Sequence, residues 1–315
     1  MQHLAERVQP KAWHRREVLA LLGLSGAVGC VGRLRQPSPA PPLWLVERGR
    51  GRVYLFGIAG ALDRAWFTPA VDRAFSDSSE IWLENAPAPS PDAAPDPKIL
   101  QAINEMTQDR NRTFYDALQP AVRVRAQAYV RDLGIDPRTI EHARPWWAYF
   151  TINTAFWQKH PPARATENVD QVLVERARGA GKLLRYEFET PLVTFRFFSA
   201  MSDEVQSQFV EMLLDFLDDE QHGRNDAAFE WTKGMPSTRA LDRMRAKTPA
   251  LYRVIQVDRN AWWARNIDQL LGRGGHSFVI IGINHILGPD SIQAQLRRLR
   301  IATATDVGAS PGRGG

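Results

Sequence analysis

His285, just behind an apolar run near the end of the chain, is the first residue whose type and position could do chemistry. The run Phe278–Ile281 holds one aromatic and three β-branched residues, which is typical of a strand buried on both faces. Gly282 then allows the backbone to turn or to approach another group closely. Ligands of open α/β sheets bind where strands end and helices begin, so His285 is predicted to be a metal ligand or a proton carrier. The alternative is a structural histidine that caps or hydrogen-bonds a neighbouring segment.

Two carboxylates stand at comparable places. Glu84 ends the short apolar strand that begins at Ile81, and Glu189 lies at the end of a strand that starts near Lys182. The first half of the chain also carries Gly57-Ile-Ala-Gly60 behind a strand, as the second half carries Gly282-Ile-Asn-His285. If the two halves share one sheet, these four points converge on one cleft. Carboxylate plus imidazole suits a hard or borderline divalent metal such as manganese, or a general acid–base pair.

These side chains need a scaffold, and the hydrophobic pattern predicts an α/β (α+β) fold with one mixed β-sheet. The sheet is expected to be built from two half-repeats with a large helical insertion. Segments 43–47 and 52–57, separated by Arg-Gly-Arg-Gly, predict a β-hairpin. Segment 301–305 is expected as an edge strand. Helices are expected over 69–76, 98–108, 114–133, 146–159, 168–178, 203–221, 226–232, 238–246, 249–271 and 290–300.

Two helical segments carry residues that resemble a site but favour a structural interpretation. The segment 146–159 is rich in aromatic residues, which indicates a helix packed into the core rather than a ligand platform. Asp215, Asp218, Asp219 and Glu220 interrupt an apolar helical pattern, which favours a solvated helix face over a metal cluster.

The charge of the chain is concentrated at its start. The formal net charge is +5, but residues 1–40 hold six of the 40 Lys and Arg and two of the 35 Asp and Glu. The remainder therefore has 34 basic against 33 acidic residues, so no stripe for nucleic acid is expected.

Residues 1–30 have the pattern of an export leader. Arg15 and Arg16 form a twin-arginine pair before an apolar segment, Val18–Val31, that is too short to span a membrane. The segment ends in Ala27-Val-Gly-Cys30, which resembles a bacterial lipobox with alanine where leucine is usual. The alternatives are a plain cleaved signal with a chance cysteine, or an uncleaved anchor.

The leader predicts an exported protein, periplasmic or held at the cell envelope by a lipid on Cys30. Because Cys30 is the single cysteine, the domain folds without an internal disulfide. Residues 31–42 read as a proline-rich tether, 43–306 as the folded domain and 307–315 as a disordered tail.

A set of short motifs occurs in order along the chain: Leu43-Trp-Leu-Val, Val53-Tyr-Leu-Phe-Gly, Ile81-Trp-Leu-Glu84, Asn168-Val-Asp-Gln, Gly181-Lys, Glu189-Thr, Arg259-Asn-Ala-Trp-Trp and Phe278-Val-Ile-Ile-Gly-Ile-Asn-His-Ile-Leu-Gly-Pro-Asp. In these motifs, over about 43–307, the sequence resembles the TraB/GumN family, which is related to the Tiki membrane-anchored metalloproteases. The resemblance implies a mixed α/β domain with two Gly-x-x-His motifs and paired glutamates. In the Tiki branch these groups serve metal-dependent peptide hydrolysis, whereas in the GumN branch the activity is inferred.

The resemblance assigns roles residue by residue. His285 matches the second family histidine, Glu84 the glutamate of the first half and Glu189 that of the second. Arg259 and Asn260 match an Arg-Asn pair on the helix before the last strand, and are interpreted as substrate-binding residues. The alternatives are a structural ion pair between the glutamates and Arg259, or an arginine that only caps a helix.

The chain departs from the family pattern at two positions. Gly60 stands where the family has its first histidine, and Met235 stands where an acidic residue is expected. A glycine offers no side chain for a metal or a proton. Asp63 could supply an oxygen ligand instead, although a solvated loop aspartate is the plainer interpretation. His276 is too far along the strand from His285 for one ion to bind both.

Two hypotheses follow for the function. The first is a peptidase-like hydrolase in which a divalent metal, manganese-like, lies on His285, Glu84 and Glu189, with one glutamate as base and Arg259 against the oxyanion. The second is a catalytically inactive binding protein of the envelope, which Gly60 favours. The ligand would be a peptide or another envelope component. Glu187, two residues before Glu189, lies on the same face of the strand and could be mistaken for the relevant carboxylate.

Overall fold

The computed structural model describes residues 40–59, 66–86, 97–161, 168–225 and 227–308. The predicted leader with Cys30, Gly60 and Asp63, and the tail from 309 lie outside the described residues. Six strands in this part of the chain form one sheet in the order β4-β3-β5-β2-β1-β6. The strands are β1 (Leu43–Arg48), β2 (Gly51–Ile58), β3 (Glu80–Asn85), β4 (Leu183–Phe188), β5 (Gly275–Gly282) and β6 (Ala304–Asp306).

The sheet is mixed, as the sequence predicts. Strands β4, β3, β5 and β2 run parallel, whereas β1 is antiparallel to both β2 and β6. The expected hairpin is β1–β2, which turns at Gly49 with a φ of 59°. The two halves of the chain interleave, because β5 of the second half lies between β2 and β3 of the first. The carboxyl ends of four parallel strands therefore meet at one edge.

The described helices are α2 (Pro69–Asp77), α3 (Pro97–Thr107), α4 (Pro120–Asp132), α5 (Pro137–Ile140), α6 (Pro145–Lys159), α7 (Val169–Gly179), α8 (Pro191–Ser199), α9 (Asp203–Gln221), α10 (Ala227–Thr232), α11 (Arg239–Lys247), α12 (Pro249–Tyr252), α13 (Arg259–Arg273) and α14 (Ile292–Arg298), with short turns η2 (Tyr115–Ala117), η3 (Arg253–Asp258) and η4 (Ile283–Ile286). Two expected helices are divided. The helix expected over 114–133 starts only at Pro120, because the residue before a proline is pushed into extended backbone, here Gln119 with ψ 147°. The helix expected over 249–271 contains the π-helical turn η3 immediately before Arg259.

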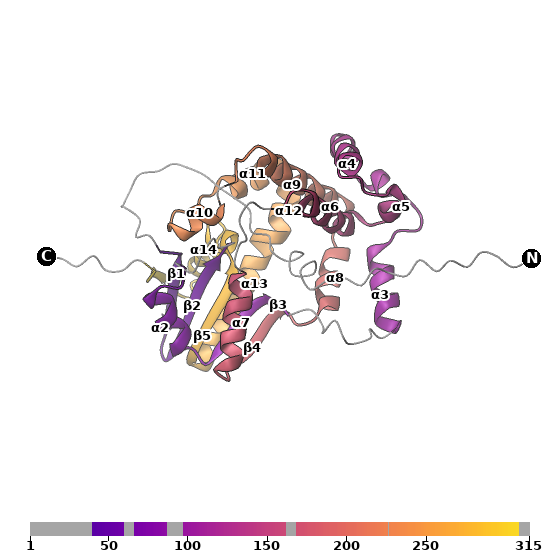
Figure 1. Cartoon of the computed structure of the whole chain (residues 1–315). Helices are drawn as coiled ribbons and strands as arrows, with labels where there is room; N and C mark the ends of the chain where they lie inside the picture. Colours follow the sequence, from indigo (N-terminus) through magenta and orange to yellow (C-terminus); the bar gives the residue numbers. More distant parts are fainter. Residues whose placement is uncertain (1–39, 60–65, 87–96, 162–167, 226, 309–315) are drawn as a thin grey trace, which may run out of the picture.

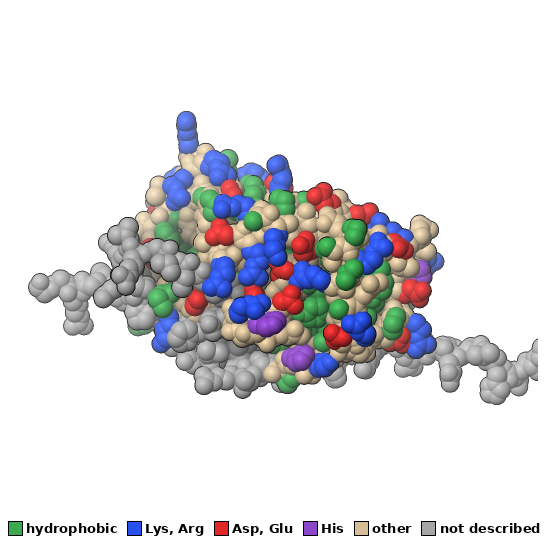
Figure 2. Space-filling view, turned by 90° about the horizontal axis from the view of Figure 1, so that it is seen from above, with side chains coloured by type: hydrophobic (Ala, Val, Ile, Leu, Met, Phe, Trp, Pro, Cys, Tyr) green, Lys and Arg blue, Asp and Glu red, His purple; other side chains and the backbone are tan. Residues whose placement is uncertain are grey.

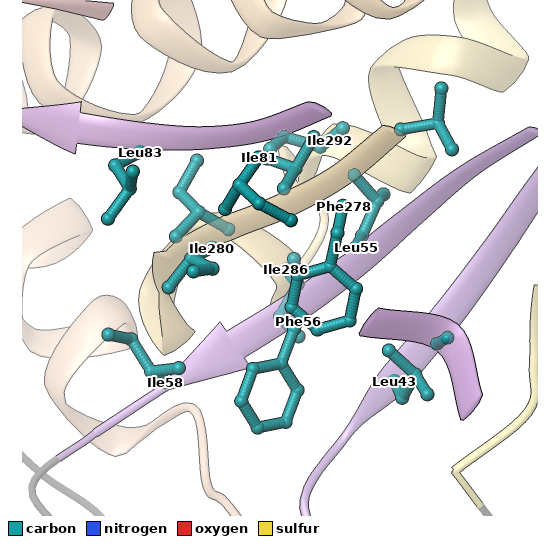
Figure 3. Packing of buried hydrophobic residues seen from close by; sticks show 14 of the residues in the cluster. Leu43, Leu55, Phe56, Ile58, Ile81, Leu83, Phe278, Ile280, Ile286 and Ile292 are labelled. Carbon is teal, nitrogen blue, oxygen red and sulfur yellow. The ribbon is translucent and has the colours of Figure 1, made fainter. Parts of the chain in front are cut away.

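The sheet is covered on both faces (Figure 1). Phe75 of α2 packs edge-on against Phe278 of β5, whereas Trp263 of α13 packs edge-on against Trp82 of β3. Phe278 lies level with Ile81, so Phe278 and Trp82 point to opposite faces. Helix α2 therefore covers one face and α13 the other. Figure 3 shows the apolar side chains of β2, β3 and β5 packed together in this core.

A second core lies among the helices, in the region of α4, α6, α9, α11 and α12. Trp146 of α6 is fully buried, and Tyr149 stacks on Phe209 of α9 with ring centroids 4.0 Å apart. The interpretation of the aromatic helix as a core element is therefore confirmed. In the part of the chain that is described, no helix has both the length and the apolar character needed to cross a bilayer.

The acidic run on α9 faces cations rather than solvent alone. Asp219 pairs with Arg243 of α11 at 2.6 Å, and Asp215 pairs with Lys247 at 2.9 Å. Basic and acidic side chains are interspersed over the face that Figure 2 shows from above. The run therefore joins α9 to its neighbouring helices, which agrees with a structural role.

Candidate functional site

Glu84 and His285 meet at the carboxyl edge of the parallel strands. The main-chain N–H of Gly282 donates to Glu84 Oε1 at 2.5 Å, and His285 Nε2 lies 3.9 Å from Glu84 Oε2. A Cβ at position 282 would stand 3.1 Å from Glu84 Oε1, so any other residue there would require this carboxylate to shift slightly. The close packing of strands β3 and β5 thus brings the predicted carboxylate and the predicted imidazole together.

Arg259 joins the same group from the first residue of α13. Its Nη2 donates to Glu84 Oε2 at 2.9 Å and to Glu187 Oε2 at 2.6 Å, and its Nε donates to Glu187 Oε1 at 2.9 Å. The side chains of Arg259 and Glu187 are 8% and 7% exposed, and that of Glu84 is 18% exposed. The ion pair is therefore buried, although solvent still reaches Glu84.

Asn260 fixes which nitrogen of His285 carries the proton. Asn260 Nδ2 donates to the main-chain oxygen of Asp290 at 2.8 Å, so Asn260 Oδ1 is turned toward His285. His285 Nδ1 lies 2.6 Å from that oxygen and must be the donor, because an amide oxygen only accepts. In the neutral ring Nε2 then has a free lone pair, and this is the nitrogen that faces Glu84.

The electrostatics keep the imidazole neutral and the carboxylate charged. Burial lowers the pKa of His285 to about 3, and the positive charge of Arg259 acts in the same direction. Burial alone would raise the pKa of Glu84, but Arg259, His285 and the Gly282 N–H together hold it below its usual value. The site therefore pairs an unprotonated imidazole nitrogen with an ionised carboxylate at neutral pH.

Glu187, and not Glu189, is the carboxylate of β4 in this group. Leu83 lies level with Tyr186 and Asn85 with Phe188, so the register sets Glu84 level with Glu187. Glu189 lies two residues further along, past the end of β4, and is exposed with no hydrogen bond or ion pair to the described residues. The expectation that Glu189 meets Glu84 and His285 is therefore not met by this geometry. A catalytic or metal-binding role for Glu189 stays a prediction.

Asp170, in the first turn of α7, belongs to the electrostatics of the site although the sequence did not single it out. Burial raises the pKa of Asp170 to about 7, and the negative charge of Glu84 adds to the shift. The side chain keeps partial contact with solvent. An aspartate behind the N-cap Asn168 is typical of a favourable helix-end charge, and only its place in the motif Asn168-Val-Asp-Gln could have drawn attention to it.

The other described histidines lie elsewhere. His276 is at the opposite end of β5, 2.9 Å from Asp77, so the argument that it cannot share an ion with His285 holds. His142 Nδ1 contacts the Arg112 carbonyl, and His222 Nδ1 contacts the Asp218 carbonyl. The ring of His160 packs against Phe156.

Gly60 and Asp63 are outside the described residues, but the strand that leads to them is placed. Ile58, the last residue of β2, lies level with Gly282, so both glycine motifs leave the same edge of the sheet. Trp231 of α10 donates its indole N–H to the Gly57 carbonyl at 2.7 Å and so ties this strand end to the helical region. Within the described ranges, no three His, Cys, Asp or Glu side chains form a group that could hold an ion.

A cavity of about 530 Å³ lies away from these groups. It is open to solvent between α3, the start of α6 and the end of α8, and Arg144 and Arg196 are among the residues that line it. No residue of the Glu84–His285 group contributes to it. The buried ion pair and the oriented imidazole, rather than cavity size, identify the candidate site.

One of the comparisons with known proteins found a match. A family model described as the TraB/PrgY/gumN family matches residues 42–301. The match covers strands β1 to β5 and ends before β6. No curated protein and no solved structure matches the chain.

Proposed function

The chain belongs to the TraB/PrgY/gumN family, and from this premise we propose that it is a metal-dependent hydrolase of peptide-type bonds, exported to the cell envelope. One observation carries the proposal. His285 presents an unprotonated Nε2 toward the ionised Glu84, while its Nδ1–H is held by Asn260. Metal-ligating histidines in proteins are oriented in this way by a second hydrogen bond.

Two of the donors that the hypothesis needs lie together among the described residues. An imidazole nitrogen and a carboxylate oxygen suit a borderline ion such as manganese. His285 Nε2 and Glu84 Oε2, which are 3.9 Å apart, would hold such an ion. When bound, such an ion supplies Lewis acidity, which polarises a carbonyl and makes a water more acidic.

The pKa values favour a ligand role for His285 over a role as general base. An imidazole whose pKa is about 3 takes up a proton poorly at neutral pH, whereas its lone pair remains available to a metal. Glu84 is likewise a weak base because its pKa is lowered. The hypothesis from the sequence gives the role of base to one of the glutamates without choosing between them, and we propose Glu189 for it because it is exposed and forms no ion pair with the described residues.

Arg259 is suited to contact the substrate oxygen. Two of its nitrogens are engaged by Glu84 and Glu187, and Nη1 makes no hydrogen bond with the described residues. A guanidinium held on one edge presents its other edge in a fixed orientation. This arrangement supports the role of Arg259 in stabilising an oxyanion, and Asn260 orients the imidazole beside it.

The proposal is tested by measuring the metal content and the peptidase activity of the purified protein. The wild type is compared with two variants, one at His285 and one at His276. We expect the wild-type chain to retain stoichiometric divalent metal and to cleave peptides, and His285→Ala to lose both. His276→Ala is the matched control and should retain both, because His276 lies at the other end of β5. A metal-free, inactive wild-type protein, or full activity in His285→Ala, would contradict the proposal.

A second candidate is a catalytically inactive envelope protein that binds a peptide or another envelope ligand at the same group of residues. Two observations favour it: Gly60 lacks the side chain of the first family histidine, and Arg259 already neutralises part of the charge on Glu84. The same metal measurement separates the candidates. A wild-type protein that binds no metal, cleaves no peptide and still retains an envelope ligand would support this second function.

Export and lipidation are part of the proposal and rest on the sequence of the leader. Twin arginines before an apolar segment support export, and Cys30 supplies the acceptor for a lipid. Fractionation of cells that express the Arg15→Lys/Arg16→Lys variant should find the protein inside. Palmitate labelling of the wild type and of Cys30→Ala tests the anchor, since label that persists without Cys30 excludes lipidation at this residue.

A further inference from the structure

We propose that Glu187 is a positioning residue that controls the Glu84–His285 pair through Arg259. Glu187 differs from the proposed metal ligands Glu84 and His285 because its hydrogen bonds go to Arg259 and Trp263 and not to His285. The inference deepens the proposed function and rests on it only for the identity of the ligand, a divalent ion.

The oxygens of Glu187 are already engaged. Oε1 accepts from Arg259 Nε at 2.9 Å, and Oε2 accepts from Arg259 Nη2 at 2.6 Å and from Trp263 Nε1 at 3.0 Å. Arg259 and Trp263 are one turn apart on α13, so one helix face presents all three donors. A carboxylate with three donors at 7% exposure is poorly placed to ligate an ion as well.

The bidentate pair sets where the remaining negative charge resides. Two carboxylates face one guanidinium, so one unit of negative charge is left over. Glu187 holds the fork of Arg259 through two nitrogens, whereas Glu84 receives a single bond from Nη2. The excess charge is therefore concentrated on Glu84, next to the lone pair of His285, where it can attract a cation.

Loss of the Glu187 charge should redirect the guanidinium. Without its bidentate partner, Arg259 can turn its fork to Glu84 and neutralise it fully, because α13 keeps the arginine within reach. Glu84 would then no longer be available to bind a cation. The electric field at His285 Nε2 would change as well. A residue that served only for folding would affect the stability of the protein but not these two quantities.

The experiment compares Glu187→Gln with Glu80→Gln in the purified full-length chain. Glutamine keeps the size of the side chain and removes its charge, and Glu80 is a matched control because it pairs with Arg273 at 3.3 Å at the opposite end of the same sheet. The readouts are Mn²⁺ affinity by calorimetry and the ¹⁵N resonances of the metal-free His285 ring. We expect Glu187→Gln to weaken Mn²⁺ binding about tenfold to a hundredfold and to shift the Nε2 resonance. Glu80→Gln should leave both the Mn²⁺ affinity and the His285 resonances in place.

Each outcome decides the inference. A folded Glu187→Gln protein with unchanged Mn²⁺ affinity and unchanged His285 resonances would overturn it. If the wild type binds no Mn²⁺, the proposed function fails, and the His285 resonances of the metal-free proteins still decide the positioning role. If Glu187→Gln does not fold, Trp263→Phe removes one donor from Glu187 and should shift the same resonance by less. No shift in that variant would then refute the inference.

Discussion

Arginines meet acidic side chains in both regions of the molecule, the sheet and the helical layer, but under different conditions. In the sheet region Arg259 serves two carboxylates, and its side chain is 8% exposed. In the helical region Asp219 is served by both Arg243 and Arg224, and these cations are 31% and 47% exposed. The buried group around Arg259 thus has more acidic than basic side chains, whereas Asp219 near the surface has two cations. The comparison indicates which ion pairs belong to a functional site. Such a pair is buried, contains more acidic than basic groups, and lies next to a polar side chain of fixed orientation.

The largest expected contrast is in the cost of removing the arginine. Arg259→Met leaves two buried carboxylates without their cation and should lower the free energy of unfolding by about 3–5 kcal/mol. Arg243→Met leaves Asp219 with Arg224 and should cost less than about 1 kcal/mol. Urea unfolding followed by tryptophan fluorescence measures both. Equal losses would show that the two networks do not differ as their burial suggests.

The pH dependence of stability gives the next contrast, because two site residues act in opposite directions. His285 has a pKa of about 3 in the folded protein, below its ordinary value of about 6.5. As the pH drops below about 6.5, the unfolded chain therefore takes up a proton at this histidine while the folded chain does not, and the free energy of unfolding falls. Asp170 has a pKa of about 7 in the fold, above its ordinary value, so stability rises as the pH drops from 7 toward 4. In the wild type these effects largely cancel between pH 5 and 6.5.

Single variants should reveal how each of the two residues changes the free energy of unfolding with pH. Asp170→Asn should lose up to about 1.4 kcal/mol of stability per pH unit on acidification from 6.5 to 5, relative to the wild type. His285→Gln should gain stability over the same interval. Unfolding curves at several pH values test this, and His276→Gln serves as the control for a histidine outside the site. Parallel pH profiles in all four proteins would refute the opposed shifts.

A pair of tryptophans compares the two cores with matched chemistry. Trp231 and Trp146 are both fully buried, and each donates its indole N–H to a carbonyl, at 2.7 Å to Gly57 and at 3.3 Å to Met106. Phenylalanine removes the same atoms at both positions. Trp231→Phe should therefore cost about 1 kcal/mol more than Trp146→Phe, since the shorter and more buried hydrogen bond is lost. Thermal and urea unfolding measure the difference, and a larger loss at Trp146 would contradict it.

The smallest effect should come from an ion pair that lies on the sheet but faces solvent. Arg52 pairs with Glu47 at 2.7 Å, and their side chains are 46% and 50% exposed. Arg52→Ala should leave the free energy of unfolding close to that of the wild type, because water screens an exposed ion pair. Such a result would show that burial, rather than membership of the sheet, separates Arg259 from the other arginines. A loss comparable with that of Arg259→Met would remove this distinction.

Much of the fold could be predicted because its signals are local. The hairpin, the buried strand before His285 and the helix behind Ser291 each follow from residues within one element. Two helices were predicted with wrong bounds, one because of a proline and the other because of an irregular turn. The proline at 120 shortened one helix, and the π-helical turn η3 divided another without any proline or glycine inside it to signal the change.

The sequence alone determined the kind of groups at the site: an imidazole, carboxylates and an arginine, each next to the end of a strand or the start of a helix. Tertiary structure decided which of them meet. Glu187 and Glu189 are two residues apart, so the alternation of a strand cannot separate them in the sequence, and only the end of β4 at Phe188 and its register against β3 set Glu187 level with Glu84. The protonation of His285 likewise depends on Asn260, 25 residues earlier, and on the Asp290 carbonyl that orients it. Both outcomes are decided by pairing between distant segments, because the energy of a sheet is summed over whole strands and not over single residues.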